Sequence, residues 1–264
     1  MSQVFVHGLG AVSPAGWDRP VLCDALEKSA PIPTQALERP GWSERLHVRR
    51  VPAPSARPAF LAHPRLRRAS AISHYALAAA LEALGDDAAR VQSGSLRLGI
   101  VLCVMAGCVS YSRRFFEETL QDPATASPLL FPETVLNAPA SHLGAYLGST
   151  GINYTLVGDN GAFLQGLAVA ADWLLHDRAD GCVVIGAEEM DWILADAMRL
   201  FVRQAIYSDG AGALYLRKQG RPDNLAELAG ITDSHPYVQH NGRGRAARSM
   251  RAQLPSPQSD ELLC

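Results

Sequence analysis

Residues 151–167 read GINYTLVGDNGAFLQGL: an apolar run, a turn of small residues and a second apolar run. The first run predicts a strand at 153–157, the small residues predict a tight turn at 158–162, and the second run predicts a helix at 163–175. A strand that passes through a tight turn into a helix lifts one side chain above the sheet and directs helix N–H groups at it. The segment therefore predicts an elbow of the kind on which α/β proteins place functional groups.

The turn of this elbow contains neither Ser nor Cys, the residue types that most often act as nucleophiles at such a position. Its residues are Asp159, Asn160, Gly161 and Ala162. Asp and Asn are strong helix N-cap residues, because their side-chain oxygens accept hydrogen bonds from the first helical N–H groups. The turn by itself therefore favours a structural cap, with a catalytic group as the alternative.

Strands and helices alternate on both sides of the elbow. Apolar runs predict further strands at 4–8, 98–104, 181–186 and 211–216, and longer periodic segments predict helices at 70–84, 110–120 and 138–147. This order is typical of a layered α/β fold with much parallel pairing.

Composition excludes several classes of protein. The chain has 24 basic and 26 acidic residues and a net charge of −2, without the basic excess of nucleic-acid-binding domains. Five cysteines without a CxxC pair indicate neither a disulfide framework nor a zinc site, so we expect no metal. The first residues do not resemble a signal peptide, and no apolar run is long enough to span a membrane. We therefore expect a cytoplasmic protein that binds neither nucleic acid nor membrane.

A short glycine motif near the N-terminus does not predict a cofactor site. Residues 8–10 read GLG, but Ser13 replaces the third glycine of the dinucleotide-binding fingerprint, and Pro14 and Gly16 follow where a helix should begin. We therefore expect no cofactor.

Several segments resemble the β-ketoacyl synthase family in the same order. Residues 151–167 resemble its active-site stretch, roughly GPSITVDTACSSSLVAL, without a gap. Further similar segments are VFVHGLGAVSPAG at 4–16, YALAAALEAL at 75–84, RLGIVLCVMAG at 97–107, SPLLFPETVLNAPASHLGAYLG at 127–148 and SDGAGALYLRK at 208–218. The resemblance implies a thiolase-like layered α/β fold.

The chain departs from the family at the catalytic positions. The family's nucleophilic cysteine aligns with Asn160, and an amide forms no thioester. The family's two catalytic histidines and its late glycine-rich loop belong to a second, similar half of the fold, of which residues 225–264 resemble only the beginning. The expected organisation is thus a ketosynthase-like N-terminal domain at 1–224 and a fragment of the second half at 225–264.

The loss of the cysteine resembles one branch of the family, the chain-length factors, which pair with an active ketosynthase. The stretch LFPETVLNAPASHL especially resembles subunits of aryl-polyene and related pigment pathways. The resemblance implies a non-catalytic partner of a β-ketoacyl-(acyl carrier protein) synthase in fatty acid or polyketide assembly. It places the partner interface at Tyr154, Thr155, Leu156 and Val157, and the loop near the partner's acyl tunnel at Leu130, Phe131 and Pro132.

Two further readings stay open. In one, Asn160 orients a thioester carbonyl for malonyl decarboxylation; in the other, the chain is a degenerate, truncated ketosynthase without activity. A local basic cluster is either a solvated face or a docking site for an acidic acyl carrier protein. It consists of Arg243, Arg245, Arg248 and Arg251. Glu188 and Glu189, at the end of a predicted strand, could form an acid pair, but they are interpreted as capping or solvent-facing residues.

Overall fold

The computed structural model describes residues 3–29, 31–159, 161–237 and 242–255. It divides the chain into two compact units, Met1–Glu227 and Leu228–Cys264, which are described separately. Asn160, the position aligned with the family's nucleophile, lies outside the described residues.

The first unit contains most of the secondary structure. Its strands are β1 (Phe5–Val12), β2 (Gln35–Leu37), β3 (Leu46–Arg49), β4 (Leu98–Val104), β5 (Asn153–Val157), β6 (Gly181–Glu188), β7 (Tyr207–Ser208), β8 (Gly210–Arg217) and β9 (Ala226–Glu227). Its α-helices are α1 (Arg19–Lys28), α2 (Ala71–Leu84), α3 (Asp87–Gln92), α4 (Val109–Gln121), α5 (Phe131–Thr134), α6 (Ala138–Leu147), α7 (Ala162–Leu175) and α8 (Trp192–Met198). Two 3₁₀ turns cover Ala59–Ala62 and Pro64–Arg68.

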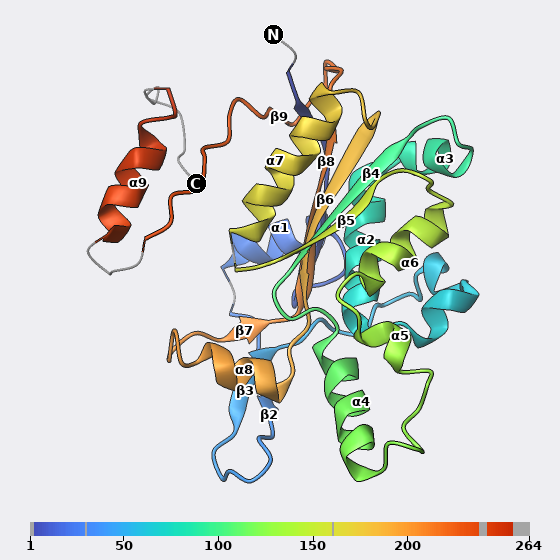
Figure 1. Cartoon of the computed structure of the whole chain (residues 1–264), viewed down its shortest axis with the longest axis vertical. Helices are drawn as coiled ribbons and strands as arrows, with labels where there is room; N and C mark the ends of the chain where they lie inside the picture. The colour runs from blue at the N-terminus through green and yellow to red at the C-terminus, as the bar shows by residue number, and fades with distance from the viewer. Residues whose placement is uncertain (1–2, 30, 160, 238–241, 256–264) are drawn as a thin grey trace. The chain divides into compact units, whose positions relative to one another are not determined.

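The main sheet has the strand order β5-β4-β6-β8-β1-β9 (Figure 1). β4 runs parallel to both β5 and β6, whereas β8 is antiparallel to β6 and to β1, and β1 is antiparallel to β9. The expectation of much parallel pairing thus holds for the β5-β4-β6 side, and the other side of the sheet is antiparallel. The elbow segment supplies β5, the strand at one end of the sheet.

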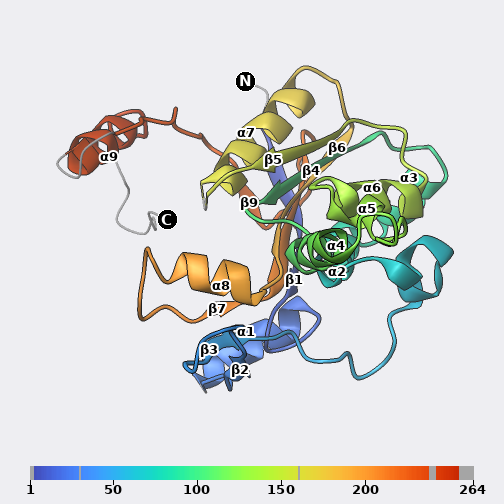
Figure 2. The same ribbon diagram turned by 60° about the horizontal axis from the view of Figure 1, so that its bottom comes forward.

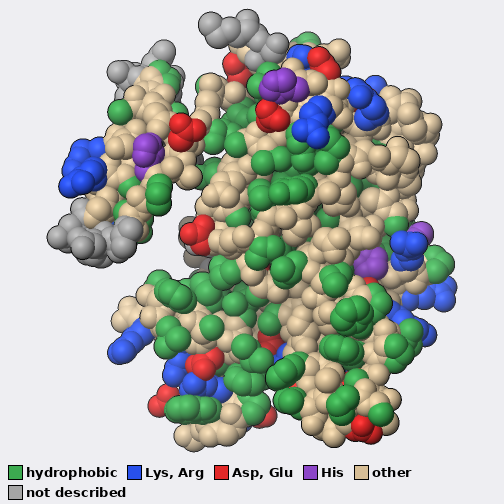
Figure 3. All heavy atoms as spheres, viewed as in Figure 1, with side chains coloured by type: hydrophobic (Ala, Val, Ile, Leu, Met, Phe, Trp, Pro, Cys, Tyr) green, Lys and Arg blue, Asp and Glu red, His purple; other side chains and the backbone are tan. Residues whose placement is uncertain are grey.

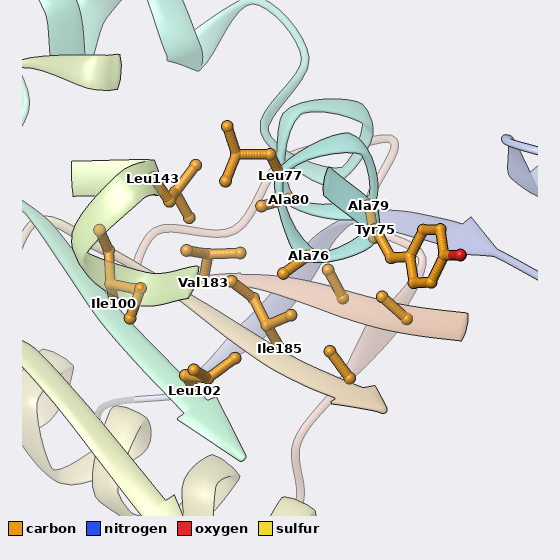
Figure 4. Close-up of a cluster of buried hydrophobic side chains, with 14 of the residues drawn as sticks. Tyr75, Ala76, Leu77, Ala79, Ala80, Ile100, Leu102, Leu143, Val183 and Ile185 are labelled. Carbon is orange, nitrogen blue, oxygen red and sulfur yellow. The ribbon is translucent and has the colours of Figure 1, made fainter. Parts of the chain in front are cut away.

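Helices cover both faces of the main sheet. α2 and α6 lie on one face and α7 lies on the other, as the two ribbon views show together (Figures 1 and 2). All seven residues of β4 are buried, which explains why this strand is a continuous apolar run instead of an alternating pattern. Figure 4 shows the core between α2, α6 and the sheet, which includes Tyr75, Ala76, Leu77, Ala79, Ala80, Ile100, Leu102, Leu143, Val183 and Ile185.

The glycine motif at 8–10 serves packing between β1 and α2. A Cβ atom on Gly8 would lie 1.9 Å from the backbone oxygen of Ala83, and one on Gly10 would lie 1.9 Å from that of Ala79. Glycine on the strand and alanine on the helix therefore allow a close backbone approach, which gives the motif a structural role.

A second, three-stranded sheet has the order β2-β3-β7. Leu46 and Val48 of β3 form a small core with Met190 and with Leu194 and Ala195 of α8. Figure 2 shows β2, β3, β7 and α8 gathered on one side of the first unit. Among the described residues, no helix has the length and apolar character needed to cross a membrane.

Candidate functional site

The elbow forms where the sequence predicts it. Gly158 donates its N–H to the oxygen of Val104 at 3.1 Å, which extends the β4–β5 ladder by one bond, and α7 begins at Ala162. Asp159 holds the turn: its Oδ1 accepts the Gly161 N–H at 2.8 Å, and its backbone oxygen accepts the Ala162 N–H at 2.9 Å. Asp159 therefore fixes the turn that precedes α7, but it is not the helix N-cap, because that position is Gly161 and has no side-chain cap.

A small cleft of about 130 Å³ lies at the elbow. It is lined by Cys103, Val104, Met105, Gly158, Asp159, Ala162, Phe163, Gly186 and Glu188. The ring of Phe163 packs against Gly186, where an added Cβ atom would lie 3.1 Å from Cδ2 of the ring. The cleft is well below the ~300–1,000 Å³ of ordinary ligand pockets, so it does not accommodate a long acyl chain.

Glu188 closes one side of this cleft and holds the loop after β4. Its carboxylate accepts the N–H of Met105 and, at 3.4 Å, the N–H of Ala106. Burial raises the pKa of Glu188, and the hydrogen bonds from the two backbone amides oppose that rise. The interpretation of Glu188 as solvent-facing is therefore wrong, because the side chain is half-buried and its carboxylate accepts two backbone N–H groups of the loop after β4.

Glu189 is only 2% exposed and joins two helix N-termini. Its Oε2 accepts the N–H of Ile72, in the first turn of α2, at 3.2 Å, and its Oε1 accepts the N–H of Ser110, in the first turn of α4, at 2.9 Å. A carboxylate at a helix N-terminus satisfies N–H groups that lack an intrahelical partner and interacts favourably with the helix dipole. Glu189 is thus a cap as predicted, but it is buried and caps two helices.

None of the three buried thiols is activated. Burial raises the pKa of Cys103, which lines the elbow cleft, to about 11, and it raises those of Cys108 and Cys182 to about 12. A thiol with such a pKa is almost entirely protonated at neutral pH, and the thiolate is the nucleophile. These residues therefore act as core side chains.

β5 presents one edge to the surface. No described strand pairs with this edge, because β5 ends the main sheet. Tyr154 is 51% exposed and Val157 is 55% exposed, while Thr155 and Leu156 are half-buried. An apolar groove of about 570 Å³ adjoins the strand and is lined by Ile152, Tyr154, Ala168, Val169, Asp172, Trp173 and Arg178.

The two edges of β5 are used by alternate residues. The oxygen of Ile152 accepts the N–H of Ile100 of β4, and the N–H of Gly158 donates to Val104 of β4. Backbone groups of a strand alternate between its two edges, so the even-numbered residues face β4. The N–H and C=O groups of Asn153, Thr155 and Val157 therefore point to the open edge. The hydroxyl of Thr155 is also buried without a hydrogen-bond partner among the described residues.

Two buried side chains, Leu130 and Glu133, anchor the segment that precedes α6. Leu130 is buried, whereas Phe131 is 58% exposed and Pro132 is exposed. The buried carboxylate of Glu133 meets Nε2 of His142 at 2.8 Å and accepts the N–H of Ser70 at 3.3 Å. These contacts fix α5 against α6 and α2.

The exposed Phe131 belongs to a larger apolar surface. Its ring lies 5.6 Å from that of Phe115 of α4. Figure 3 shows hydrophobic side chains spread over the part of this face where α4, α5 and α8 lie. The exposed members on α4, on α5 and beside it are Phe116, Leu120, Leu129, Phe131, Val135 and Leu136.

The basic cluster lies in the second unit, on α9 (Arg243–Arg251). Arg243, Arg245 and Arg248 are exposed, and Arg251 donates from Nη1 to the oxygens of Leu254 and Pro255. In the described part of the chain, no three or more His, Cys, Asp or Glu side chains gather in a way that holds a metal ion.

Residues 1–214 match the family model of the β-ketoacyl synthase N-terminal domain. This match covers most of the chain, which therefore belongs to the β-ketoacyl synthase family. None of the curated proteins matches it.

Solved structures share the thiolase-like fold at low sequence identity. The ishigamide ketosynthase/chain length factor has 20% identity and a TM-score of 0.66, over 88% of this chain and 64% of that chain. The ketosynthase ApeO in complex with its chain length factor ApeC, from Xenorhabdus doucetiae, has 16% identity and a TM-score of 0.71, over 96% of this chain and 68% of that chain. The complex of AntDE with the acyl carrier protein AntF has 19% identity and a TM-score of 0.74, over 94% of this chain and 73% of that chain. This chain thus spans less than two thirds of the length of the ishigamide protein.

Proposed function

We propose that this chain is a ketosynthase-like subunit without condensing activity of its own, which pairs with a catalytic β-ketoacyl-(acyl carrier protein) synthase in polyketide or polyene-type fatty acid assembly. The observation that carries the proposal is the open edge of β5. It combines unpaired backbone groups with the exposed side chains of Tyr154 and Val157. An edge of this kind is a template for a strand from another chain.

Two features of the elbow support a non-catalytic role. The position of the family's nucleophile is Asn160, which forms no thioester. The cleft at the elbow is small, and Phe163 forms part of its wall. The growing acyl group would therefore lie in the partner's tunnel, and this protein would line one side of that tunnel.

The remaining contacts follow from this arrangement. The partner's strand pairs with Tyr154–Val157, and the loop at Leu130, Phe131 and Pro132 faces the partner's acyl tunnel. The exposed arginines of α9 attract an acidic acyl carrier protein. The open edge and the apolar surface of α4 and α5 would both be covered in the heterodimer.

Co-expression with the ketosynthase of its own pathway tests the proposal. We expect a stable one-to-one complex by light scattering, and synthase activity that requires both chains. Incubation of this chain alone with an acyl thioester should leave its intact mass unchanged. A stable acyl adduct on this chain would contradict the proposal, and so would a monomer that binds no ketosynthase of its pathway.

Asn160→Ala distinguishes the decarboxylase reading. If the amide orients a malonyl carbonyl, the substitution lowers malonyl decarboxylation by the complex while the complex still forms. On the account proposed here, decarboxylation by the complex stays unchanged.

A further inference from the structure

The loop between β2 and β3 brings an arginine and a tryptophan together. Residues 39–42 read RPGW, and the N–H of Trp42 donates to the oxygen of Arg39 at 3.1 Å. Pro40 occupies the second position of this turn, and Gly41, with φ of +80°, occupies the third. This is the pattern of a type II turn, in which the third residue adopts a conformation that favours glycine. The turn thus fixes Arg39 and Trp42 as neighbours.

The guanidinium of Arg39 is held on two sides. Trp42 lies over it, with 3.8 Å between the guanidinium carbon and the ring centroid. Its Nη2 atom donates to Oδ2 of Asp196, on α8, at 2.5 Å. As a result the Arg39 side chain is only 10% exposed, although Trp42 itself is 62% exposed.

Two nitrogen atoms of this buried cation have nothing to bind. Nε and Nη1 of Arg39 are inaccessible to water and have no hydrogen-bond partner among the described residues. A guanidinium carries five N–H donors, and buried polar groups in native proteins are almost always satisfied. Trp42 lies over the guanidinium that carries these donors, and most of its own side chain is exposed.

The surrounding loop lines an open hollow of about 500 Å³. Its lining residues are Glu38, Arg39, Pro40, Gly41, Trp42, Ser43 and Arg45. Arg45 stands on the rim with a side chain that is 65% exposed, and its Nη2 atom lies 3.9 Å from Oε1 of Glu38. All of the lining residues belong to the first unit, and the bond from Arg39 to Asp196 joins the β2–β3 loop to α8, which lies near β3 in Figure 2.

We propose that the Arg39–Trp42 loop is a binding site for a carboxylate ion, which takes the free N–H groups of Arg39 once Trp42 moves aside. Guanidinium groups bind planar carboxylates through charge-assisted hydrogen bonds. The charges favour a singly charged ligand over phosphate. Asp196 pairs with both Arg39 and Arg199, and Glu38 lies near Arg45, so the three cations exceed the two carboxylates by one positive charge. This site is separate from the elbow and from β5, and it does not depend on the function proposed above.

The test uses the indole of Trp42 and the Nε–H proton of Arg39 as reporters, with acetate as the probe. We expect a saturable change in tryptophan fluorescence at millimolar acetate, together with a downfield shift of the Arg39 Nε–H proton in ¹⁵N-edited NMR. Trp42→Phe should abolish the fluorescence change but should keep the NMR shift. Trp192 also lies on α8, the helix of Asp196, so Trp192→Phe is the matched control and should keep the fluorescence change. Arg39→Lys keeps the positive charge beside Asp196 and should abolish the fluorescence change.

Three results would overturn the proposal. The first is the absence of a saturable response to acetate in the unchanged protein. The second is a response that survives in Arg39→Lys, which would place the anion elsewhere. The third is an equal or stronger response to phosphate at the same ionic strength, because the net charge around Arg39 matches one negative charge and not two. Arg45→Gln serves as a second variant: it removes a rim charge without touching the buried donors, and it should weaken acetate binding only a few-fold.

Discussion

Leu102 of β4 is the register partner of Thr155 of β5, and their backbone groups face in different directions. In a parallel pair, one residue of each register pair directs its N–H and C=O at the facing strand, and its partner directs its own away. Here the hydrogen bonds of Ile152 and Gly158 fix the alternation. The N–H and C=O of Leu102 point at β5, whereas the N–H and C=O of Thr155 point away from β4, to the open edge. Neighbouring residues of β5 therefore serve the fold and the proposed interface separately.

Glu189→Gln should destabilise the first unit by roughly 1–3 kcal/mol, the usual cost of leaving a buried donor unsatisfied. The carboxylate accepts N–H groups from both Ile72 and Ser110, whereas an amide offers one oxygen and one NH₂ group. Urea denaturation measures the loss. Glu27→Gln, at an exposed position of α1, is the matched control and should change the free energy of unfolding by less than about 0.5 kcal/mol. Equal stabilities for the two variants would show that the double cap contributes nothing.

Asp87→Asn should destabilise the protein in a way that depends on pH. Burial by itself raises the pKa of Asp87, but hydrogen bonds from Tyr215 and Arg90 and the charge of Arg217 outweigh it and lower the pKa below its ordinary value. Because the folded pKa is depressed, the stabilisation is present above the unfolded pKa and is lost as pH falls through the folded pKa. Removing the charge from this buried cluster should cost about 3–5 kcal/mol at neutral pH.

The pH profile of unfolding checks this prediction. The difference in the free energy of unfolding between Asp87→Asn and the unchanged protein should shrink as the pH falls below about 4, near the unfolded pKa of an aspartate. Asp86→Asn, at the exposed neighbouring position, should leave the free energy of unfolding almost unchanged at every pH. A difference for Asp87→Asn that stays constant from neutral to acidic pH would contradict the assignment.

Thiol labelling should separate Cys23 from the buried cysteines. Cys23 is exposed, whereas Cys103, Cys108 and Cys182 are buried with raised pKa values. In a Cys264→Ser background, an aromatic disulfide reagent at pH 8 should release about one equivalent rapidly and the remaining three only after unfolding. Rapid labelling of Cys103 in the folded protein would mean that the elbow cleft contains an accessible, activated thiol.

The sequence predicts the central elements well, because their patterns are strong. The bounds of β4, α6 and β5 agree with the predicted 98–104, 138–147 and 153–157. Local composition is enough to predict buried strands bounded by glycine and helices with faces of small residues. α1 was missed, although Asp18 and Pro20 are a start signal: the Asp18 carboxylate accepts the N–H of Val21 at 2.9 Å.

The features that sequence reasoning missed depend on contacts between distant residues. Glu189 meets helix termini far away in the chain, and Arg39 meets Asp196 across 157 positions. β7 has only two residues and forms by pairing with β3, so no local sequence pattern predicts it. At the candidate site, the strand–turn–helix pattern of residues 151–167 predicted the elbow, but the small cleft and the side chain of Phe163 in its wall depend on packing between elements.

A pair of proline variants tests the proposed partnership most directly. Thr155→Pro removes an N–H from the open edge of β5, and proline is tolerated on an edge strand at such a position. Leu156→Pro removes an N–H that faces β4 and should damage the fold itself. Each variant is co-expressed with the ketosynthase of its pathway, and the co-purified complex is measured by light scattering alongside circular dichroism of the isolated chain. The account predicts that Thr155→Pro keeps the native spectrum and unfolding midpoint but loses the one-to-one complex, whereas Leu156→Pro loses both. A Thr155→Pro chain that still forms the full complex would contradict the claim that a ketosynthase strand pairs with this edge.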